Sequence, residues 1–113
     1  MRDSEELREA SFLILAALAG GPQHGYAVIR DVQIASNGRV ALVASTVYSA
    51  VGRLVASGLV AELSSDVVRG RYRRYYELTD LGVERLGDEI ARWRSNTAHA
   101  TLRLASRLSA GVG

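Results

Sequence analysis

The fold is decided by the stretch from Ser45 to Leu59, which reads STVYSAVGRLVASGL. Its apolar residues have the spacing of one face of an α-helix, and they are Val47, Val51, Leu54 and Val55. The Ser45 hydroxyl is suited to cap the first turn, and Gly58 can adopt the left-handed conformation that often ends a helix. The stretch therefore predicts a helix over residues 45–57 with one buried face.

The opposite face of this predicted helix is small, polar and basic. It carries Thr46, Ser49, Ala50 and Arg53, and no carboxylate. Short side chains beside one long guanidinium suit a helix that lies against phosphates and base edges in the major groove of DNA. An ordinary solvent-exposed helix has the same pattern, so the interpretation depends on the surrounding elements.

The composition excludes several classes of protein. The chain has 113 residues, of which 48% are hydrophobic and 23% charged, as in a single folded domain. The longest apolar run, residues 12–19, is too short to cross a bilayer, and acidic residues precede it where a signal peptide would be positive. The absence of cysteine excludes disulfides and thiolate metal sites and indicates a reducing cytoplasm.

The basic residues are clustered on a nearly neutral chain. The net charge of +2 is too small to indicate a nucleic-acid partner by itself. Every basic residue is arginine, however, and four arginines fall within residues 69–74. The sequence therefore predicts a local basic patch.

Two helices are expected before the central stretch. The first runs from about Glu5 to Ala19 and ends at Gly20-Gly21-Pro22; it is apolar enough to need cover on two sides, which a partner subunit can supply. The second runs from about His24 to Ala35 and is followed by a turn at Asn37-Gly38. Residues 40–43 fit either a brief strand or an extended connector.

A β-hairpin is expected after the central helix. Residues 59–63 and 73–78 alternate in polarity as strands do, and a polar, basic segment separates them. Neighbouring strand residues point to opposite faces, so Arg73 and Arg74 cannot both face DNA, and we expect Arg71 and Arg73 on the DNA side. A solvated charged turn is the alternative interpretation.

A long helix is expected from Thr79, which caps it, with Asp80 in the first turn where the helix dipole favours an acid. About 28 residues would extend about 40 Å, which is more than a domain of this size can bury. The apolar residues of this helix follow the 3.5-residue period of a coiled-coil seam, and they are Leu86, Ile90, Trp93, Thr97, Ala100 and Leu104. The seam predicts packing against a second chain over part of the helix, because Gly87 and Thr97 weaken it.

The order of these elements is that of a winged helix-turn-helix. We expect an α+β fold that is mainly α, with a winged helix-turn-helix DNA-binding domain over residues 5–78 and a long C-terminal dimerisation helix over residues 79–108. The third helix would enter the major groove while the hairpin arginines reach a phosphate strand or the minor groove. The residues expected to bind DNA are Ser45, Thr46, Tyr48, Ser49, Arg53, Arg69, Arg71, Arg73 and Arg74.

Four motifs in this order resemble the PadR family of bacterial transcriptional regulators. They are His24-Gly25-Tyr26, Ser45-Thr46-Val47-Tyr48, residues 54–60 (LVASGLV) and residues 70–82 (GRYRRYYELTDLG). The chain length is similar to that of short-form members, whose C-terminal part is a single dimerisation helix. The resemblance implies a homodimeric winged-helix protein, usually a repressor, that a small molecule releases from its operator in some members.

Two positions depart from the family pattern. Ala44-Ser45 stands where members commonly have proline-glycine, and Tyr72 stands where the wing commonly has proline between its arginines. The first change alters the capping of the recognition helix and the second loosens the hairpin tip. The operator sequence therefore does not follow from the resemblance.

Several aromatic residues have two interpretations. We expect Tyr26 to pack at the edge of the core, whereas packing and a phosphate hydrogen bond fit Tyr48 equally well. Trp93 fits an anchor of the dimer interface; the resemblance implies the alternative that it stacks on planar ligands, as an aromatic on this helix does in multidrug-responsive members. The residues expected at the dimer interface or effector site are Trp93, Ile90, Leu86, Phe12 and Leu15.

No catalytic motif is present in the sequence, and His24, expected at a helix start, is far in sequence from His99. We therefore expect no enzymatic activity, no cofactor and no metal. The expected function is that of a cytoplasmic, homodimeric transcriptional regulator that acts as a repressor. Its expected partners are a palindromic DNA operator and a small planar hydrophobic effector, and no membrane partner is expected. The alternative is a winged-helix protein–protein interaction module without specific DNA binding, against which the arginine cluster argues.

Overall fold

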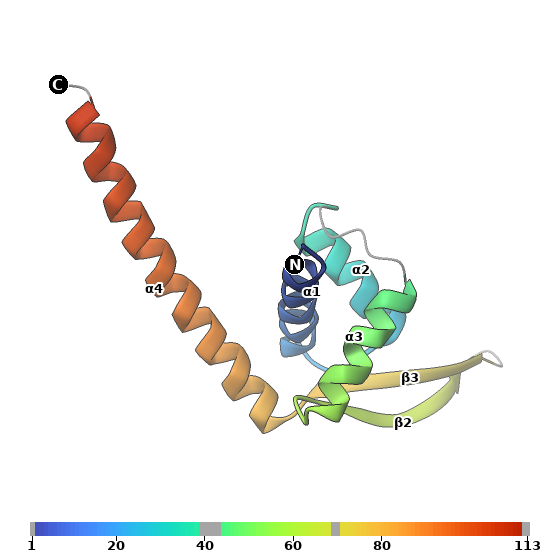
Figure 1. The fold of residues 1–113 in the computed structure, drawn as a ribbon. Helices are drawn as coiled ribbons and strands as arrows, with labels where there is room; N and C mark the ends of the chain where they lie inside the picture. Colours follow the sequence, from blue (N-terminus) through green and yellow to red (C-terminus); the bar gives the residue numbers. More distant parts are fainter. Residues whose placement is uncertain (1, 39–43, 69–70, 112–113) are drawn as a thin grey trace.

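The computed structural model describes residues 2–38, 44–68 and 71–111, with side chains described outside residues 2–7, 64–68 and 71–73. Its elements are α1 (Arg2–Ala19), β1 (Gln23–His24), α2 (Gly25–Ala35), α3 (Ala44–Ala56), β2 (Val60–Val68), β3 (Arg71–Leu78) and α4 (Asp80–Gly111). The first three helices gather against the base of a hairpin, and α4 extends away from them (Figure 1). The predicted winged helix-turn-helix with a long C-terminal helix is confirmed.

The core lies where the three helices meet the hairpin. Its fully buried large side chains are Ile14 of α1, Val28 and Val32 of α2, Val51 of α3 and Val60 of β2. α1 contacts α2, α3, β3 and α4. The two-sided cover that its apolar sequence requires is therefore supplied within the chain, and a partner subunit is not needed for it.

The sheet has three antiparallel strands in the order β1-β3-β2, so β3 is central. β1 pairs Gln23 with Tyr76 and His24 with Tyr75, and an irregularity interrupts the pairing of β2 with β3 between Leu63 and Asp66. β1 was not predicted from the sequence, because two residues between a Gly-Pro turn and a helix show no alternation. This strand supplies support that an isolated hairpin lacks.

Helix ends follow the predicted signals. Gly58 has φ 79°, and the amide of Leu59 donates to the carbonyl of Leu54 at 3.0 Å, which closes the end of α3. Asn37 and Gly38 also have positive φ, at 54° and 75°, in the predicted turn after α2. Thr79 caps α4 as predicted, since its Oγ1 accepts from the amide of Gly82 at 3.0 Å.

Some predicted boundaries and faces are wrong. α3 begins at Ala44, so Ser45 lies inside its first turn and does not cap it, and α1 begins at Arg2 and not at Glu5. Ala50 is fully buried, because it lies only about 60° around the helix from Val47 and the core covers a broad sector of α3. The segment at residues 40–43 lies outside the described residues.

α4 gives the chain its elongated shape. Its 32 residues, a few more than predicted, include two buried ones, Gly82 and Leu86, both near its start. The chain measures 68 × 28 × 25 Å and has a radius of gyration of 17.5 Å, against about 13 Å for a compact 100-residue domain. Among the described residues, no helix combines the length and the apolar character needed to cross a membrane.

Candidate nucleic-acid interface

α3 presents a small, polar surface to solvent. Ser45, Tyr48, Ser49 and Arg53 are exposed on it, and Thr46 is half-buried. The helix carries no carboxylate, and Arg53 in its last turn is its charged residue. The five residues predicted to bind DNA from this helix are thus accessible on one element, although Thr46 lies near the edge of the exposed surface.

Tyr48 holds α3 against α2. A Cβ atom built on Gly25, at the start of α2, would lie 2.5 Å from Cε1 of Tyr48 and 2.9 Å from its hydroxyl oxygen. The Tyr48 side chain nevertheless remains 47% exposed. Tyr48 therefore packs between the two helices, as one of its two interpretations predicted, and it keeps access to solvent; the phosphate hydrogen bond remains a prediction.

The start of α2 is organised by His24. Its Nδ1 accepts from the amide of Ala27 at 3.2 Å, so it caps α2, in agreement with its predicted place at a helix start. Its ring also meets that of Tyr75 edge-on, with centroids 5.8 Å apart. Tyr26, in contrast, is 65% exposed, so the prediction that it packs at the core edge is wrong.

Gln23 is a structural residue that the sequence analysis did not identify. Its Nε2 donates to the carbonyl of Ala17 at 2.9 Å and to Oδ2 of Asp31 at 3.0 Å. These bonds connect the end of α1 with the middle of α2 through β1. No local sequence signal identifies such a role, because its partners lie six and eight residues away.

The wing arginines differ in their placement. Arg71 and Arg73 belong to β3, where they pair with Val68 and Asp66 of β2, while Arg69 lies outside the described residues. Arg74, also a predicted DNA-binding residue, forms an ion pair with Glu62 of β2, with Nε 3.3 Å from Oε1. One of the four predicted wing contacts is thus already paired within the chain.

Tyr76 lies beside this ion pair. It is opposite Glu62 in the sheet and two residues from Arg74, so the three share one face of the hairpin. Burial raises the pKa of the Tyr76 hydroxyl above its usual 10.0, and the charges of Glu62 and, more weakly, Tyr48 add to the rise. Arg74 opposes it through its charge and a side-chain hydrogen bond. Glu62, Arg74 and Tyr76 therefore form one cluster on the hairpin.

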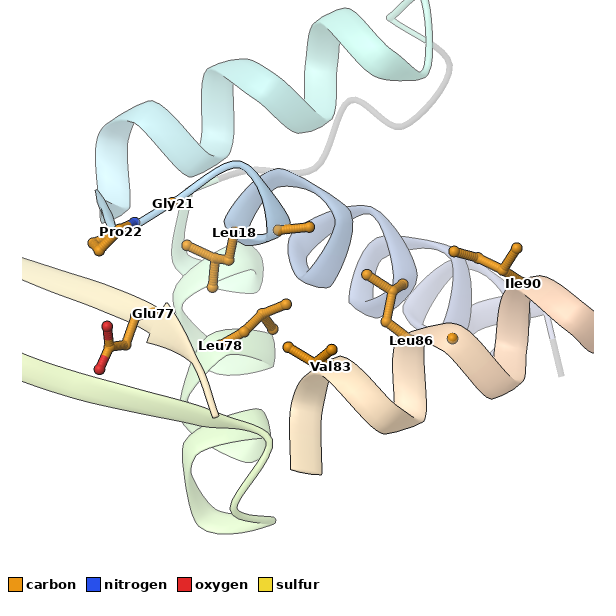
Figure 2. A pocket seen from close by; sticks show the side chains of 10 residues that line it. Leu18, Gly21, Pro22, Glu77, Leu78, Val83, Leu86 and Ile90 are labelled. Atoms are coloured by element: carbon orange, nitrogen blue, oxygen red, sulfur yellow. The ribbon is translucent and has the colours of Figure 1, made fainter. Parts of the chain in front are cut away.

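An apolar groove of 470 Å³ lies between the end of α1, the end of β3 and the start of α4 (Figure 2). Leu86 and Ile90, two of the residues predicted for an effector site, line it, and Glu77 is the charged residue among its lining residues. Leu15 belongs to the core, which Phe12 flanks. Leu15 and Leu86 are 4% and 7% exposed, so little of either side chain remains to meet a second chain.

Beyond the groove, α4 carries an exposed apolar stripe. Ile90, Trp93, Leu104 and Leu108 lie on the side of the helix that buries Leu86 near its start. Trp93 is 57% exposed. The stripe follows the predicted seam and extends it by Leu108, whereas the exposed Leu102 lies on nearly the opposite side.

The sequence matches the family described as the transcriptional regulator PadR-like family over residues 14–88, which is more than half of the chain. This chain belongs to the PadR-like family. The match includes α2, α3, the hairpin and the start of α4. The family's description is that of transcriptional regulators, in agreement with the regulatory function expected from the sequence.

A relative identified by sequence is much longer than this chain. The chain is 36% identical over 100 residues to an uncharacterized 37.1 kDa protein in transposon TN4556 of Streptomyces fradiae, covering 88% of this chain. It spans 25% of the length of that relative.

Solved structures share the PadR-like fold. A PadR family transcription regulator from Clostridium difficile R20291 has 25% identity and a TM-score of 0.72, with 84% of this chain and 97% of that one covered. Bacillus subtilis PadR in complex with operator DNA has 21% identity and a TM-score of 0.63, with 71% and 45% covered.

Proposed function

We propose that this PadR-like protein binds a specific DNA operator as a homodimer and represses transcription. The observation that carries the proposal is the exposed face of α3, which is small, polar and free of carboxylates and lies beside a wing rich in arginine. The similar fold of Bacillus subtilis PadR, whose structure contains operator DNA, supports it. A DNA partner also agrees with the cytoplasmic location expected from the sequence.

In the proposed complex α3 enters the major groove. The hydroxyls of Ser45, Thr46 and Ser49 can donate to and accept from base edges, and their short side chains allow close approach. Arg53, at the other end of the helix, is suited to a phosphate. The wing arginines Arg69, Arg71 and Arg73 would bind phosphates or the minor groove, which gives affinity and orientation more than sequence discrimination.

The homodimer is proposed from the exposed stripe of α4. A helix of 32 residues that buries two of them leaves a long apolar surface, and a second copy of the same helix offers a complementary one. Two subunits related by a twofold axis would present their α3 helices to half-sites about 34 Å apart on a palindromic operator.

A small planar hydrophobic effector is proposed at this dimer interface. Trp93 is exposed on the stripe and can either anchor the dimer or stack on a ligand. An effector releases DNA only if it binds the free arrangement more tightly than the DNA-bound one. Titration of candidate ligands should therefore quench Trp93 fluorescence and weaken operator binding together, and quenching with unchanged operator affinity would contradict the coupling.

DNA binding is tested by fluorescence anisotropy with the DNA upstream of the protein's own gene and a scrambled fragment, at several salt concentrations. We expect tight, salt-sensitive binding to the native fragment alone. Replacement of Arg71 and Arg73 by alanine should lower affinity and reduce the slope of log affinity against log salt by about 0.9 for each lost phosphate contact.

A control for each single replacement is Arg103→Ala, which removes one positive charge from an exposed site on α4 away from its apolar stripe. This variant should bind the operator as the parent does. Equal and weak binding of the parent to both fragments would instead favour a winged-helix module that binds other proteins.

A further inference from the structure

An ion pair between Glu62 of β2 and Arg74 of β3 joins the two strands of the wing. We propose that Glu62 holds Arg74 against the hairpin, so that this arginine positions the wing beside α3 instead of binding phosphate, and that this restraint limits affinity for DNA of arbitrary sequence. The inference rests on the DNA-binding function proposed above. It assigns Glu62 a role in specificity and Arg74 a positioning role.

The geometry of the hairpin places Arg74, Glu62 and Tyr76 on one face. Glu62 lies directly opposite Tyr76, and Arg74 lies diagonally across from Glu62, close enough for Nε to approach Oε1 at 3.3 Å. A guanidinium held by a carboxylate has fewer donors left for a phosphate than a free arginine has.

The same cluster extends to the recognition helix. Tyr76 is buried in the core that it shares with Val47, Ala50 and Val51 of α3. The face of the hairpin that carries the ion pair therefore continues at Tyr76 into the core beneath the recognition helix, where a fixed Arg74 contributes to the placement of the wing.

The charges of Arg74 and Glu62 should affect binding to DNA of arbitrary sequence more than binding to the operator. Attraction between arginines and phosphates supplies nearly all of the affinity for arbitrary sequence, whereas base contacts supply the preference for the operator. The side chains of Arg74 and Glu62 are 64% and 42% exposed, so both are accessible to an approaching phosphate. A carboxylate there repels phosphate and occupies an arginine, and both effects weaken non-specific binding.

The direct test is Glu62→Gln, which keeps the shape of the side chain and removes its charge. We expect affinity for scrambled DNA to rise about three- to tenfold at low salt, and the salt slope to steepen by about 0.9, as one phosphate contact is added. Operator affinity should rise less, because base contacts by α3 restrict how far a freed Arg74 can turn. The ratio of operator to scrambled affinity should therefore fall.

Three further variants distinguish restraint of Arg74 from a general effect of removing a charge. Glu77→Gln removes the same charge from the groove end of β3 and should leave the salt slope unchanged. Arg74→Gln alone should also leave the slope unchanged, since the proposal gives Arg74 no phosphate contact in the parent protein. The double variant Glu62→Gln with Arg74→Gln should return the slope to that of the parent.

Each contrary outcome has a distinct meaning. A slope reduced by about 0.9 in Arg74→Gln would show that Arg74 binds phosphate in the parent and would overturn the proposal, even if Glu62→Gln folds poorly. An unchanged slope in a folded Glu62→Gln protein would overturn it as well. If the parent protein binds the operator no more tightly than scrambled DNA, the proposed function itself fails. If the parent prefers the operator and the Glu62→Gln variant has the same affinities and salt slope, only the inference about Glu62 fails.

Discussion

Tyr48 of α3 occupies the space that a side chain on Gly25 of α2 would need. A Cβ atom at Gly25 would lie 2.5 Å from Cε1 of Tyr48, closer than carbon atoms approach in folded proteins. The two helices of the helix-turn-helix therefore meet through a glycine and an aromatic ring. The placement of the recognition helix depends on a residue that precedes Tyr48 by 23 positions.

Gly25→Ala should displace the Tyr48 ring and lower the free energy of unfolding by about 1 kcal/mol. This is at the lower end of the destabilisation that overpacking causes, because the ring is partly exposed and can move. Operator affinity should fall with it. Chemical denaturation of Gly25→Ala, Tyr48→Ala and the double variant measures the coupling, and the cost of Gly25→Ala should vanish once the ring is absent. Gly52→Ala in α3 is the control, since a Cβ there meets nothing within 4 Å.

Gly82→Ala should destabilise the protein by about 3 kcal/mol. A Cβ at Gly82 would clash with the carbonyl oxygen of Leu59, and a backbone atom cannot move aside as a side chain can. Gly87→Ala, five residues later in α4, has open space around it and should instead stabilise by about 0.5–1 kcal/mol through helix propensity. Thermal unfolding should show a lower midpoint temperature for Gly82→Ala and a higher one for Gly87→Ala. Equal shifts of the two midpoints would contradict the prediction.

Thr79→Ala should lower the free energy of unfolding by about 1–2 kcal/mol. The Thr79 hydroxyl donates to the carbonyl of Gly58 at 2.6 Å and accepts from the amide of Gly82 at 3.0 Å, so it caps α4 and ties that helix to the end of α3. Thr79→Ser keeps both bonds and should retain most of the stability. Urea denaturation of the three proteins measures the difference, and equal losses in both variants would exclude the hydroxyl as the cause.

Stability should fall as pH rises above about 10, and Tyr76 should contribute to the loss. Burial holds the pKa of folded Tyr76 above its unfolded value of 10.0, so the folded protein retains this proton at a pH where the unfolded chain releases it. The favourable contribution is complete below the unfolded pKa and is lost as pH rises through the folded one. Denaturation between pH 8 and 11.5 should therefore show a shallower decline for Tyr76→Phe than for the parent.

Leu104→Glu should weaken the proposed homodimer, because Leu104 lies on the apolar stripe of α4. Leu102 is the matched control: it is more exposed, at 72% against 58%, but lies about 160° away around the helix. Light scattering after size-exclusion chromatography should show a monomer, or a more readily dissociated dimer, for Leu104→Glu alone. Dissociation by Leu102→Glu to the same extent would place the interface elsewhere.

Local patterns of sequence determined much of this protein. The spacing of Val47, Val51 and Leu54 predicted the recognition helix, and Gly58 and Thr79 predicted where helices end and begin, because caps and periodicity act between neighbours in the chain. The order of the elements then predicted the winged helix-turn-helix, and with it a polar face on α3 and a basic wing.

Tertiary structure alone decided which of these residues remain available to contact DNA or a second chain. Leu15 and Leu86 became core, Arg74 was paired with Glu62, and β1 joined the sheet. Each outcome depends on distances between segments remote in sequence, which packing and strand register set. Sequence therefore determined the elements and their chemistry, whereas the packed fold decided which side chains can meet a partner.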